Sequence, residues 1–395
     1  GTITAANLAA GAINTAASAF GTCPPGQYLR GLLATGTVLC EPFGMPPLST
    51  SVDRSSDDVG SAASIAIGSD GLPIISQRDG TNGDLRVTHC NNLLCTAATS
   101  TTVDSANDVG RETSIAIGSD GLAIISHQDF TNGNLRVTHC NNLLCTAATS
   151  TSVDTPNIVG VESSIAIGTD GLAIISHHDS TNGDLRVTHC SNLLCTAATS
   201  TTVDSANDVG HETSIAIGSD GLAIISHQDS TNGDLRVTHC NNVLCTAATS
   251  TSVDTVSNVG TYTSIAIGID GLAIISHYGG TSVDLRVTHC DNVLCTTATS
   301  TSVDTPGLVG LYSSIAIGSD GLPIISHHDL ANRDTKVTHC SNVLCTQATS
   351  TSVDTATFAG PTSIAIGTDG LPIIAYYEGT TSDLRVTHCS SRTCQ

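Results

Sequence analysis

The sequence predicts an all-β fold, a seven-bladed β-propeller built from four-stranded blades. The first observation is a repeat. The phrase SIAIG begins at Ser64, Ser114, Ser164, Ser214, Ser264, Ser314 and Ser363. The second is that the phrase VTHC follows it in every copy. The interval is 50 residues, and 49 for the last copy. A period of about 40 to 50 residues in a β-rich chain is typical of propeller blades.

Each unit reads as four strands. In the fourth unit we expect them at residues 214–218, 222–226, 234–240 and 245–254. The Asp-Gly of SDGL suits a tight hairpin after the first strand, and TNGD supplies the next turn. LAIIS is a short apolar run that suits burial on both faces, and DLRVTHC alternates its side chains between two faces. The fourth strand is rich in Thr and Ser, and a VG loop leads to the next unit.

The two ends of the repeat array predict that the ring is closed. The seventh unit stops at Gln395, just after THCSSRTC, and has no fourth strand. The segment STSVD at residues 49–53 precedes the first SIAIG and supplies that strand. A closed ring leaves no open sheet edge, which explains the displacement. We therefore expect one propeller at residues 48–395 and a separate N-terminal segment at residues 1–47.

Several phrases resemble a known group of tandem repeats. SIAIGSDGLPIIS, TNGDLRVTHC and TSVD are similar to repeats of secreted and surface proteins of bacteria, which are taken to be β-propellers, and the resemblance covers residues 48–395. CPPGQYLRGLLATGTVLC, from Cys23 to Cys40, is similar to a Cys-bracketed hairpin segment of bacterial extracellular proteins. The resemblance implies a fold and an extracellular location, but propellers host many functions.

Composition narrows the possible partners. The chain has 395 residues, with 35 Asp and Glu against 13 Lys and Arg and a net charge of -22. This charge argues against nucleic acid and against anionic lipid, and it favours a cationic or cell-surface partner. No segment suits membrane insertion. Because the chain begins at Gly1 and its single Met is Met45, we expect that a secretory leader has been removed.

The sixteen cysteines predict disulfides in an oxidising compartment. A C-x4-C spacing recurs in every unit, and neighbours such as His89 and Cys90 point to opposite faces of a strand, so they do not easily share a metal ion. A disulfide across the turn is favoured over a metal site. The expected pairs are Cys90–Cys95, Cys140–Cys145, Cys190–Cys195, Cys240–Cys245, Cys290–Cys295, Cys340–Cys345 and Cys389–Cys394, with Cys23–Cys40 in the N-terminal segment.

One histidine and one cation recur on the third strand of every unit. The histidines are expected to be buried and bonded to a hydroxyl or backbone group; they are His89, His139, His189, His239, His289, His339 and His388. The cations are expected to pair with a carboxylate of the same or the neighbouring blade; they are Arg86, Arg136, Arg186, Arg236, Arg286, Lys336 and Arg385.

Calcium and catalysis are the weaker alternatives. Asp179, Asn182 and Asp184 offer oxygen ligands on one loop, but an Asn-Gly type turn with aspartate caps is favoured over a calcium loop. Catalysis needs one converging, asymmetric set of groups. No unit shows one, and the pairs at 177–178 and 327–328 are expected to be exposed loop residues. We therefore assign no cofactor, no metal ligand and no catalytic residue, and expect no enzyme.

The units differ mainly in two loops, those from fourth to first strand and from second to third strand. In an up-and-down blade both loops emerge on one face, which we call the varied face. This face is the candidate partner surface, although drift in tolerant loops is an equal alternative. Its apolar residues are Phe130, Tyr262, Tyr278, Leu311, Tyr312 and Leu330.

The uncharged N-terminal stretch suggests self-assembly. Its apolar residues Ile3, Leu8, Ile13 and Phe20 are the candidate assembly residues, docking on a neighbouring propeller to build a filament. The leading hypothesis is thus an extracellular structural or adhesive subunit. The second is a lectin-like or protein-binding propeller that uses the varied face, and the third is a secreted hydrolase.

Overall fold

The computed structural model describes residues 27–32, 38–42, 47–54, 58–256, 258–305, 307–355 and 359–395. The chain forms two compact units, residues 1–46 with 395, and residues 47–394. The first contains an antiparallel pair, β1 (Gln27–Leu32) and β2 (Val38–Pro42). Cys23 and the candidate assembly residues lie outside the described residues, so the predictions of a Cys23–Cys40 bridge and of assembly stay open.

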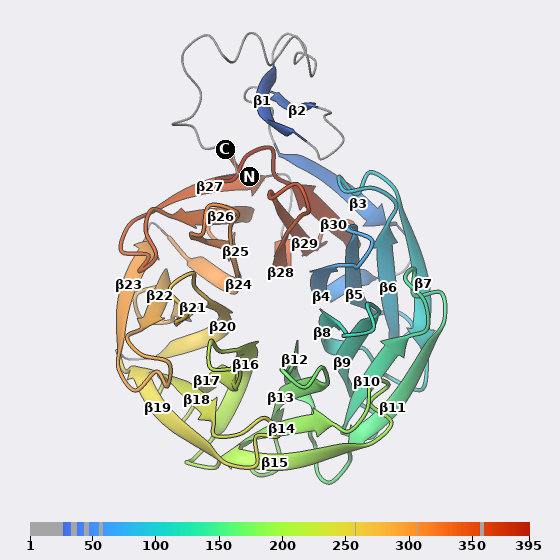
Figure 1. Cartoon of the computed structure of the whole chain (residues 1–395), viewed down its shortest axis with the longest axis vertical. Coiled ribbons are helices and arrows are strands. Elements are labelled where there is room, and N and C mark those ends of the chain that lie inside the picture. Colours follow the sequence, from blue (N-terminus) through green and yellow to red (C-terminus); the bar gives the residue numbers. More distant parts are fainter. Residues whose placement is uncertain are drawn as a thin grey trace. The chain divides into compact units, whose positions relative to one another are not determined.

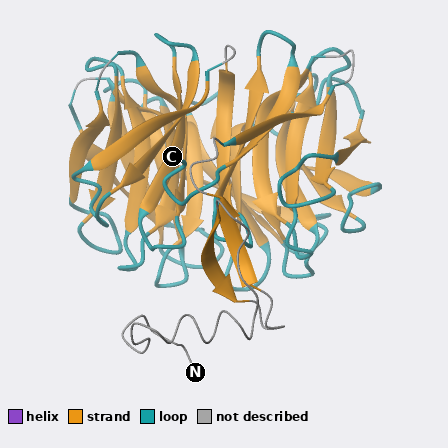
Figure 2. Ribbon diagram, turned by 90° about the horizontal axis from the view of Figure 1, so that it is seen from above, coloured by secondary structure: helices purple, strands orange, loops and turns teal. Residues whose placement is uncertain are grey.

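The second unit is the predicted seven-bladed propeller (Figure 1), with seven four-stranded antiparallel sheets around one axis. Figure 2 shows the strands running between two faces that carry the loops. The described residues contain no helix.

The strands of each blade follow one another along the chain. The first blade contains β4 (Val59–Ile67), β5 (Pro73–Asp79), β6 (Asp84–Cys90) and β7 (Ala98–Asp104). The second contains β8 (Arg111–Ile117), β9 (Ala123–Asp129), β10 (Asn134–Cys140) and β11 (Ala148–Asp154). The third contains β12 (Val161–Ile167), β13 (Ala173–Asp179), β14 (Asp184–Cys190) and β15 (Ala198–Asp204). The fourth contains β16 (Val209–Ile217), β17 (Ala223–Asp229), β18 (Asp234–Cys240) and β19 (Ala248–Asp254). The fifth contains β20 (Val259–Ile267), β21 (Ala273–Gly279), β22 (Asp284–Cys290) and β23 (Ala298–Asp304). The sixth contains β24 (Val309–Ile317), β25 (Pro323–Asp329), β26 (Asp334–Cys340) and β27 (Ala348–Asp354). The seventh is β28 (Ala359–Ile366), β29 (Pro372–Glu378), β30 (Asp383–His388) and β3 (Leu48–Asp53).

The ring closes as predicted. Strand β3 pairs antiparallel with β30, placing Ser49 opposite Thr387 and Thr50 opposite Val386. The hydroxyls of Ser49 and Thr387 lie 2.7 Å apart. Because β3 is the first strand of the propeller in sequence and β30 the last, this pairing joins the two ends of the ring and covers the edge that β30 would otherwise expose.

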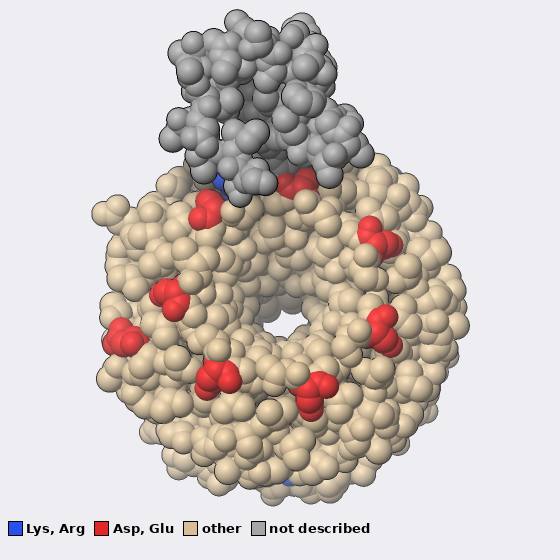
Figure 3. All heavy atoms as spheres, viewed as in Figure 1, with Lys and Arg blue, Asp and Glu red and all other residues tan. Residues whose placement is uncertain are grey.

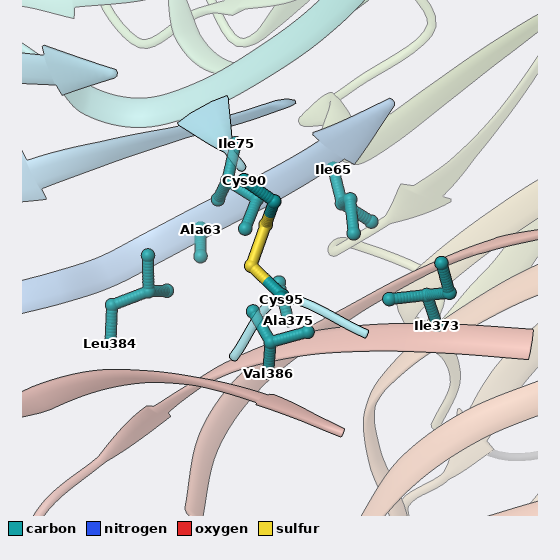
Figure 4. Close-up of a cluster of buried hydrophobic side chains, with 9 residues drawn as sticks. All are labelled: Ala63, Ile65, Ile75, Cys90, Cys95, Ile373, Ala375, Leu384 and Val386. Atoms are coloured by element: carbon teal, nitrogen blue, oxygen red, sulfur yellow. A yellow bond between two sulfur atoms is a disulfide. The ribbon is translucent and has the colours of Figure 1, made fainter. Parts of the chain in front are cut away.

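The hydrophobic core lies between neighbouring blades. In the cluster of Figure 4, Ile75 and the disulfide Cys90–Cys95 of the first blade pack against Ile373 and Val386 of the seventh. Such clusters recur around the ring, and the cysteines of the seven C-x4-C disulfides are fully buried in them. The predicted disulfides are confirmed for all seven blades. Each serves as core packing as well as a cross-link.

The recurring third-strand histidines are buried, as predicted, but their partner differs from the prediction. His89 Nε2 lies 2.9 Å from Asp70 Oδ2, so the imidazole meets a carboxylate rather than a hydroxyl or a backbone group. Asp70 belongs to the SDGL turn, and its other oxygen accepts a hydrogen bond from the N–H of Leu72. The same pair recurs in all seven blades. It ties the first turn of a blade to the end of its third strand.

The recurring cations pair across blades, which confirms the predicted pairing. Arg136 in the second blade donates from Nη2 to Asp104 Oδ2, the last residue of the first blade's outer strand, at 2.7 Å. Arg86 makes the same contact with Asp53 of β3 at 3.0 Å. The pair recurs at every blade junction, with Lys336 in place of arginine once.

The TNGD loop is the capped turn favoured over calcium. Asp179 Oδ1 accepts hydrogen bonds from the N–H groups of Thr181 and Asn182, at 3.1 and 3.2 Å. Its Oδ2 accepts one from the side-chain amide of Asn182 at 2.9 Å. The oxygens of Asp179 therefore already hold the turn.

The inner strand is longer than predicted. SIAIG predicts a first strand that starts at Ser64, whereas β4 begins at Val59 and includes the VG segment. Its pairing with β5 shifts register twice, between Val59 and Ser61 and between Ser61 and Ser64. Residues at these register shifts line the cavity described next.

Candidate functional site at the channel mouth

Residues in the first half of each inner strand line a cavity of about 360 Å³ at one end of the central channel. Because the inner strands begin at the loops that differ among units, this mouth opens on the varied face. Two layers of side chains line it. The deeper layer is uniform and small: Ala63, Thr113, Ser163, Thr213, Thr263, Ser313 and Thr362. The outer layer differs from blade to blade: Ala62, Glu112, Glu162, Glu212, Tyr262, Tyr312 and Pro361.

The outer layer has an unfavourable backbone conformation. Glu112 and Glu212 have φ values of 50° and 52°, in the left-handed region that favours glycine. Tyr262 and Tyr312 share it, each with a φ of 52°. Such a residue costs on the order of 1 kcal/mol or more, and strain of this kind gathers at functional sites.

Three glutamates in consecutive blades form an arc of carboxylates. Glu112 accepts a short hydrogen bond from the N–H of Glu162, through Oε2. Glu162 Oε2 in turn accepts one from the N–H of Glu212 at 2.6 Å. Glu112 and Glu162 thus each reach the bulge of the following blade, and the arc extends over three neighbouring blades.

Burial of the carboxyl groups of the arc disfavours their ionised forms. Burial, followed by repulsion from Glu162 and Glu112, raises the pKa of Glu212 to about 8. Burial also raises the pKa of Glu112. A positive charge entering the mouth would favour the ionised form of both groups.

Tyrosines occupy the next part of the outer layer. The rings of Tyr262 and Tyr312 lie 4.4 Å apart at an angle of 53°, and Tyr278 lies 6.4 Å from Tyr262. Burial raises the pKa of Tyr262, so its hydroxyl is neutral. Aromatic faces therefore continue the rim beyond Glu212.

Beside the arc, two histidines meet at the junction of the third and fourth blades. The ring centroids of His178 and His211 are 3.9 Å apart. His211 Nε2 lies 3.0 Å from Asp208 Oδ1, and its Nδ1 lies 3.5 Å from Glu162 Oε2. The described residues contain one group of three His, Cys, Asp or Glu suited to holding a metal ion: Glu162, His178 and His211.

The pKa values at this junction follow from the pairing. The hydrogen bond to Glu162 is the main cause that raises the pKa of His211 to about 9. Burial disfavours the charged form of Glu162, but hydrogen bonds from His211 and from the N–H of Glu212 outweigh it and lower the carboxyl pKa. Burial and the neighbouring His211 lower the pKa of His178.

The expectation that the paired histidines are exposed loop residues is wrong. His177, His178, His327 and His328 lie in second strands and are at most 3% exposed. An imidazole near the varied face can still be buried because the next blade covers it.

At other blade junctions, the positions equivalent to His178 and His211 carry different side chains that make different contacts. At the first junction, Arg78 and Arg111 both bond to Asp108, at 2.8 and 2.9 Å. Burial works against the Asp108 carboxylate, but the two guanidinium groups outweigh it and lower its pKa. Arg111 also lies 3.4 Å from the ring centroid of Phe130.

The structure separates the six predicted partner-face residues. Tyr262, Tyr278 and Tyr312 come together at the channel mouth. Phe130 and Leu330 lie on loops of the second and sixth blades, 54% and 37% exposed, and Leu311 is half-buried.

Sequence reasoning missed the glutamate arc and His211. The available signal is a glutamate at one repeat position in three consecutive units, at 112, 162 and 212.

Fold and site define a seven-bladed propeller with an individualised channel mouth. No protein-family model matches the chain, and no curated protein matches it. The predicted relationship to bacterial repeat proteins therefore stays a resemblance. None of the described residues forms a helix long and apolar enough to cross a membrane.

Solved structures share the fold. One is a protein of unknown function from Dyadobacter fermentans, 8% identical with a TM-score of 0.56, covering 92% of this chain and 99% of that one. Another is an ulvan lyase, a polysaccharide lyase, 9% identical with a TM-score of 0.55, covering 86% and 93%. A third is the NanB sialidase from Streptococcus pneumoniae, 10% identical with a TM-score of 0.50, covering 88% and 70%. At these identities the likeness concerns the fold alone.

Proposed function

We propose that this protein is a non-enzymatic, extracellular binding propeller whose channel mouth takes a cationic group, an ammonium or a guanidinium. One observation carries the proposal. Glutamates of three neighbouring blades stand next to a pair of packed tyrosines, in a layer whose residues are strained, above a layer of small uniform residues.

The chemistry of the mouth suits a cation. Glu112 and Glu212 are ionised more readily when a positive charge approaches them, and the faces of Tyr262 and Tyr312 attract a cation through their ring quadrupoles. A cavity of about 360 Å³ is large enough for a lysine or arginine side chain. The net charge of -22 would attract a cationic partner to the molecule as a whole. Figure 3 shows acidic side chains spaced around one face of the ring, which add to this general attraction but do not mark the channel mouth.

The extracellular location is inferred from the disulfides. Seven buried bridges suggest an oxidising environment, because reducing compartments keep thiols unpaired. We infer from this that the protein works outside the cell.

Calorimetric titration with tetra-arginine, tetra-lysine and tetra-glutamate tests the proposal. EDTA in the buffer removes any contribution of metal ions. We expect the two cationic peptides to bind and the double variant Glu112→Gln, Glu212→Gln to bind them at least about tenfold more weakly, since each lost charge contact is worth about 1 kcal/mol or more.

Asp291→Asn is the matched control. Asp291 is exposed on the turn between third and fourth strands, and the first unit has Asn91 in its place. The control removes one negative charge at the other end of a blade and should leave binding unchanged. Equal binding of tetra-glutamate, or full binding by the double variant, would refute the proposal. Binding to a glycan array instead would favour the lectin-like alternative.

The filament hypothesis is a second proposal, and it concerns residues 1–22. If these residues dock on a neighbouring propeller, the intact chain should form filaments visible by electron microscopy. Deletion of residues 1–22 should leave monomers in light scattering. Unchanged assembly of the shortened chain would exclude this role. No contact among the described residues particularly favours the hydrolase alternative.

A further inference from the structure

Most histidines of the chain have a repeated structural role. Of the 15 histidines, seven form the His–Asp pairs at the ends of the third strands. Five more are fully buried in second strands, and each bonds both to a threonine hydroxyl and to a glycine N–H: His127, His177, His227, His277 and His327. The remaining three are His178, His211 and His328. Two of these meet at the junction of the third and fourth blades.

The atoms at this junction converge. One ligand atom from each of Glu162, His178 and His211 lies within 4.8 Å of the others. His178 is 3% exposed, and its Nε2, 3.5 Å from Asp208 Oδ1, makes no hydrogen bond of good geometry with the described residues. Its Nδ1 lies 3.3 Å from Ser180 Oγ. Because Nδ1 has this contact, Nε2 is the ring nitrogen left for a metal ion.

We propose that Glu162, His178 and His211 bind a divalent transition-metal ion of the zinc type. Two imidazoles and one carboxylate are the donor set that such ions prefer. His211 Nε2 would donate to Asp208, which orients the ring as carboxylates do for metal-bound histidines, and leave Nδ1 facing Glu162. Glu162 also belongs to the glutamate arc, but the metal proposal does not depend on cation binding by Glu112 and Glu212.

Solvent can reach the site. The side chains of His211 and Glu162 are 25% and 23% exposed, and Asp208 is 50% exposed. A buried imidazole thus forms the inner wall, and half-exposed groups form the entry that a metal site requires.

Neighbouring junctions show why the site belongs to one pair of blades. The position of His178 is taken by Gln128 and Gln228 in the adjacent blades. Gln228 donates from its side-chain amide to the carbonyl of Val259 in the following blade, at 3.3 Å. A glutamine is therefore compatible with packing at this position.

The experiment uses the full chain without a histidine tag, freed of metal with EDTA and then dialysed. Zn²⁺ binding is measured by calorimetry, and Co²⁺ binding by its visible absorption, which reports the ligand set. We expect one Zn²⁺ per chain and a raised melting temperature. His178→Gln and His211→Thr should weaken binding about 100-fold or more, and Asp208→Asn about tenfold or more. Thr261 is the natural counterpart of His211 in the next unit.

His328→Gln is the matched control. His328 has the same strand position as His178 and is 1% exposed, but the seventh unit has Gly360 at the position of His211. This variant should bind Zn²⁺ like the wild type. Absence of Zn²⁺ binding would show an ion-pair network only, and equal loss in His328→Gln and His178→Gln would show a general packing effect. Either result would overturn the proposal.

Discussion

Residue 127 is a histidine that is completely buried, with both ring nitrogens in hydrogen bonds. His127 Nδ1 accepts from the N–H of Gly110 at 3.2 Å, so its proton is on Nε2, which lies 2.9 Å from Thr138 Oγ1. Burial lowers the pKa of His127 to about 4, although Asp104 lies 3.8 Å from Nε2. His227 and His277 also have pKa values of about 4, for the same reason. These residues stay neutral where a solvated histidine becomes charged.

Acid should therefore destabilise the fold through these histidines. The folded pKa of about 4 lies below the unfolded value of about 6.5, so the unfolded chain binds more protons between these values. Stability falls as pH falls from about 6.5 to about 4, by up to about 1.4 kcal/mol per pH unit for each histidine. Above about 6.5 the effect is absent.

The first blade supplies the control substitution. Gln77 has the place of His127, and its side-chain amide bonds to Thr88 Oγ1 at 2.8 Å and to Asp53 at 2.9 Å. We expect the triple variant His127→Gln, His227→Gln, His277→Gln to lose less stability between pH 7 and pH 5 than the wild type. Urea denaturation at both pH values measures this, and parallel losses in the two proteins would contradict it.

At the scale of the element, the segments that repeat without change could be predicted, whereas the first part of the inner strand could not. SIAIG predicts the regular part of the strand because its apolar residues recur in every unit. The preceding segment has a glutamate or tyrosine with positive φ, which runs against the preference of both residue types. That conformation depends on the neighbouring blade, where Thr113 Oγ1 donates to the carbonyl of Ala62 at 2.9 Å. A contact between residues 51 positions apart is not visible in a local pattern.

The site was harder to predict than the fold for the same reason. The disulfides follow from a spacing within one turn, and the turn caps follow from a short polar phrase. The glutamate arc joins residues at intervals of 50, which the closed ring alone brings together. The His–Asp pairs likewise need the folded blade, since His89 on the third strand and Asp70 on the first turn are 19 residues apart.

At the scale of the whole molecule, closure depends on one strand. Strand β3 completes the seventh blade, and its last residue also holds the first blade. Asp53 accepts hydrogen bonds from Arg86 Nε at 3.1 Å and from Gln77 at 2.9 Å. Loss of β3 would expose the edge of β30 and leave Arg86 without its main carboxylate partner, which is costly for a mostly buried guanidinium.

Two truncations separate the role of β3 from that of the residues before it. Deletion of residues 1–46 removes the first compact unit and leaves β3 in place, so the melting temperature should stay within a few degrees of wild type. Deletion of residues 1–54 also removes β3. We expect that chain to melt lower by on the order of 10 °C and to associate through the exposed β30 edge. Circular dichroism and size-exclusion chromatography with light scattering measure both effects. Equal melting temperatures for the two truncations would mean that the ring is held by the inter-blade cores and ion pairs, with β3 contributing little.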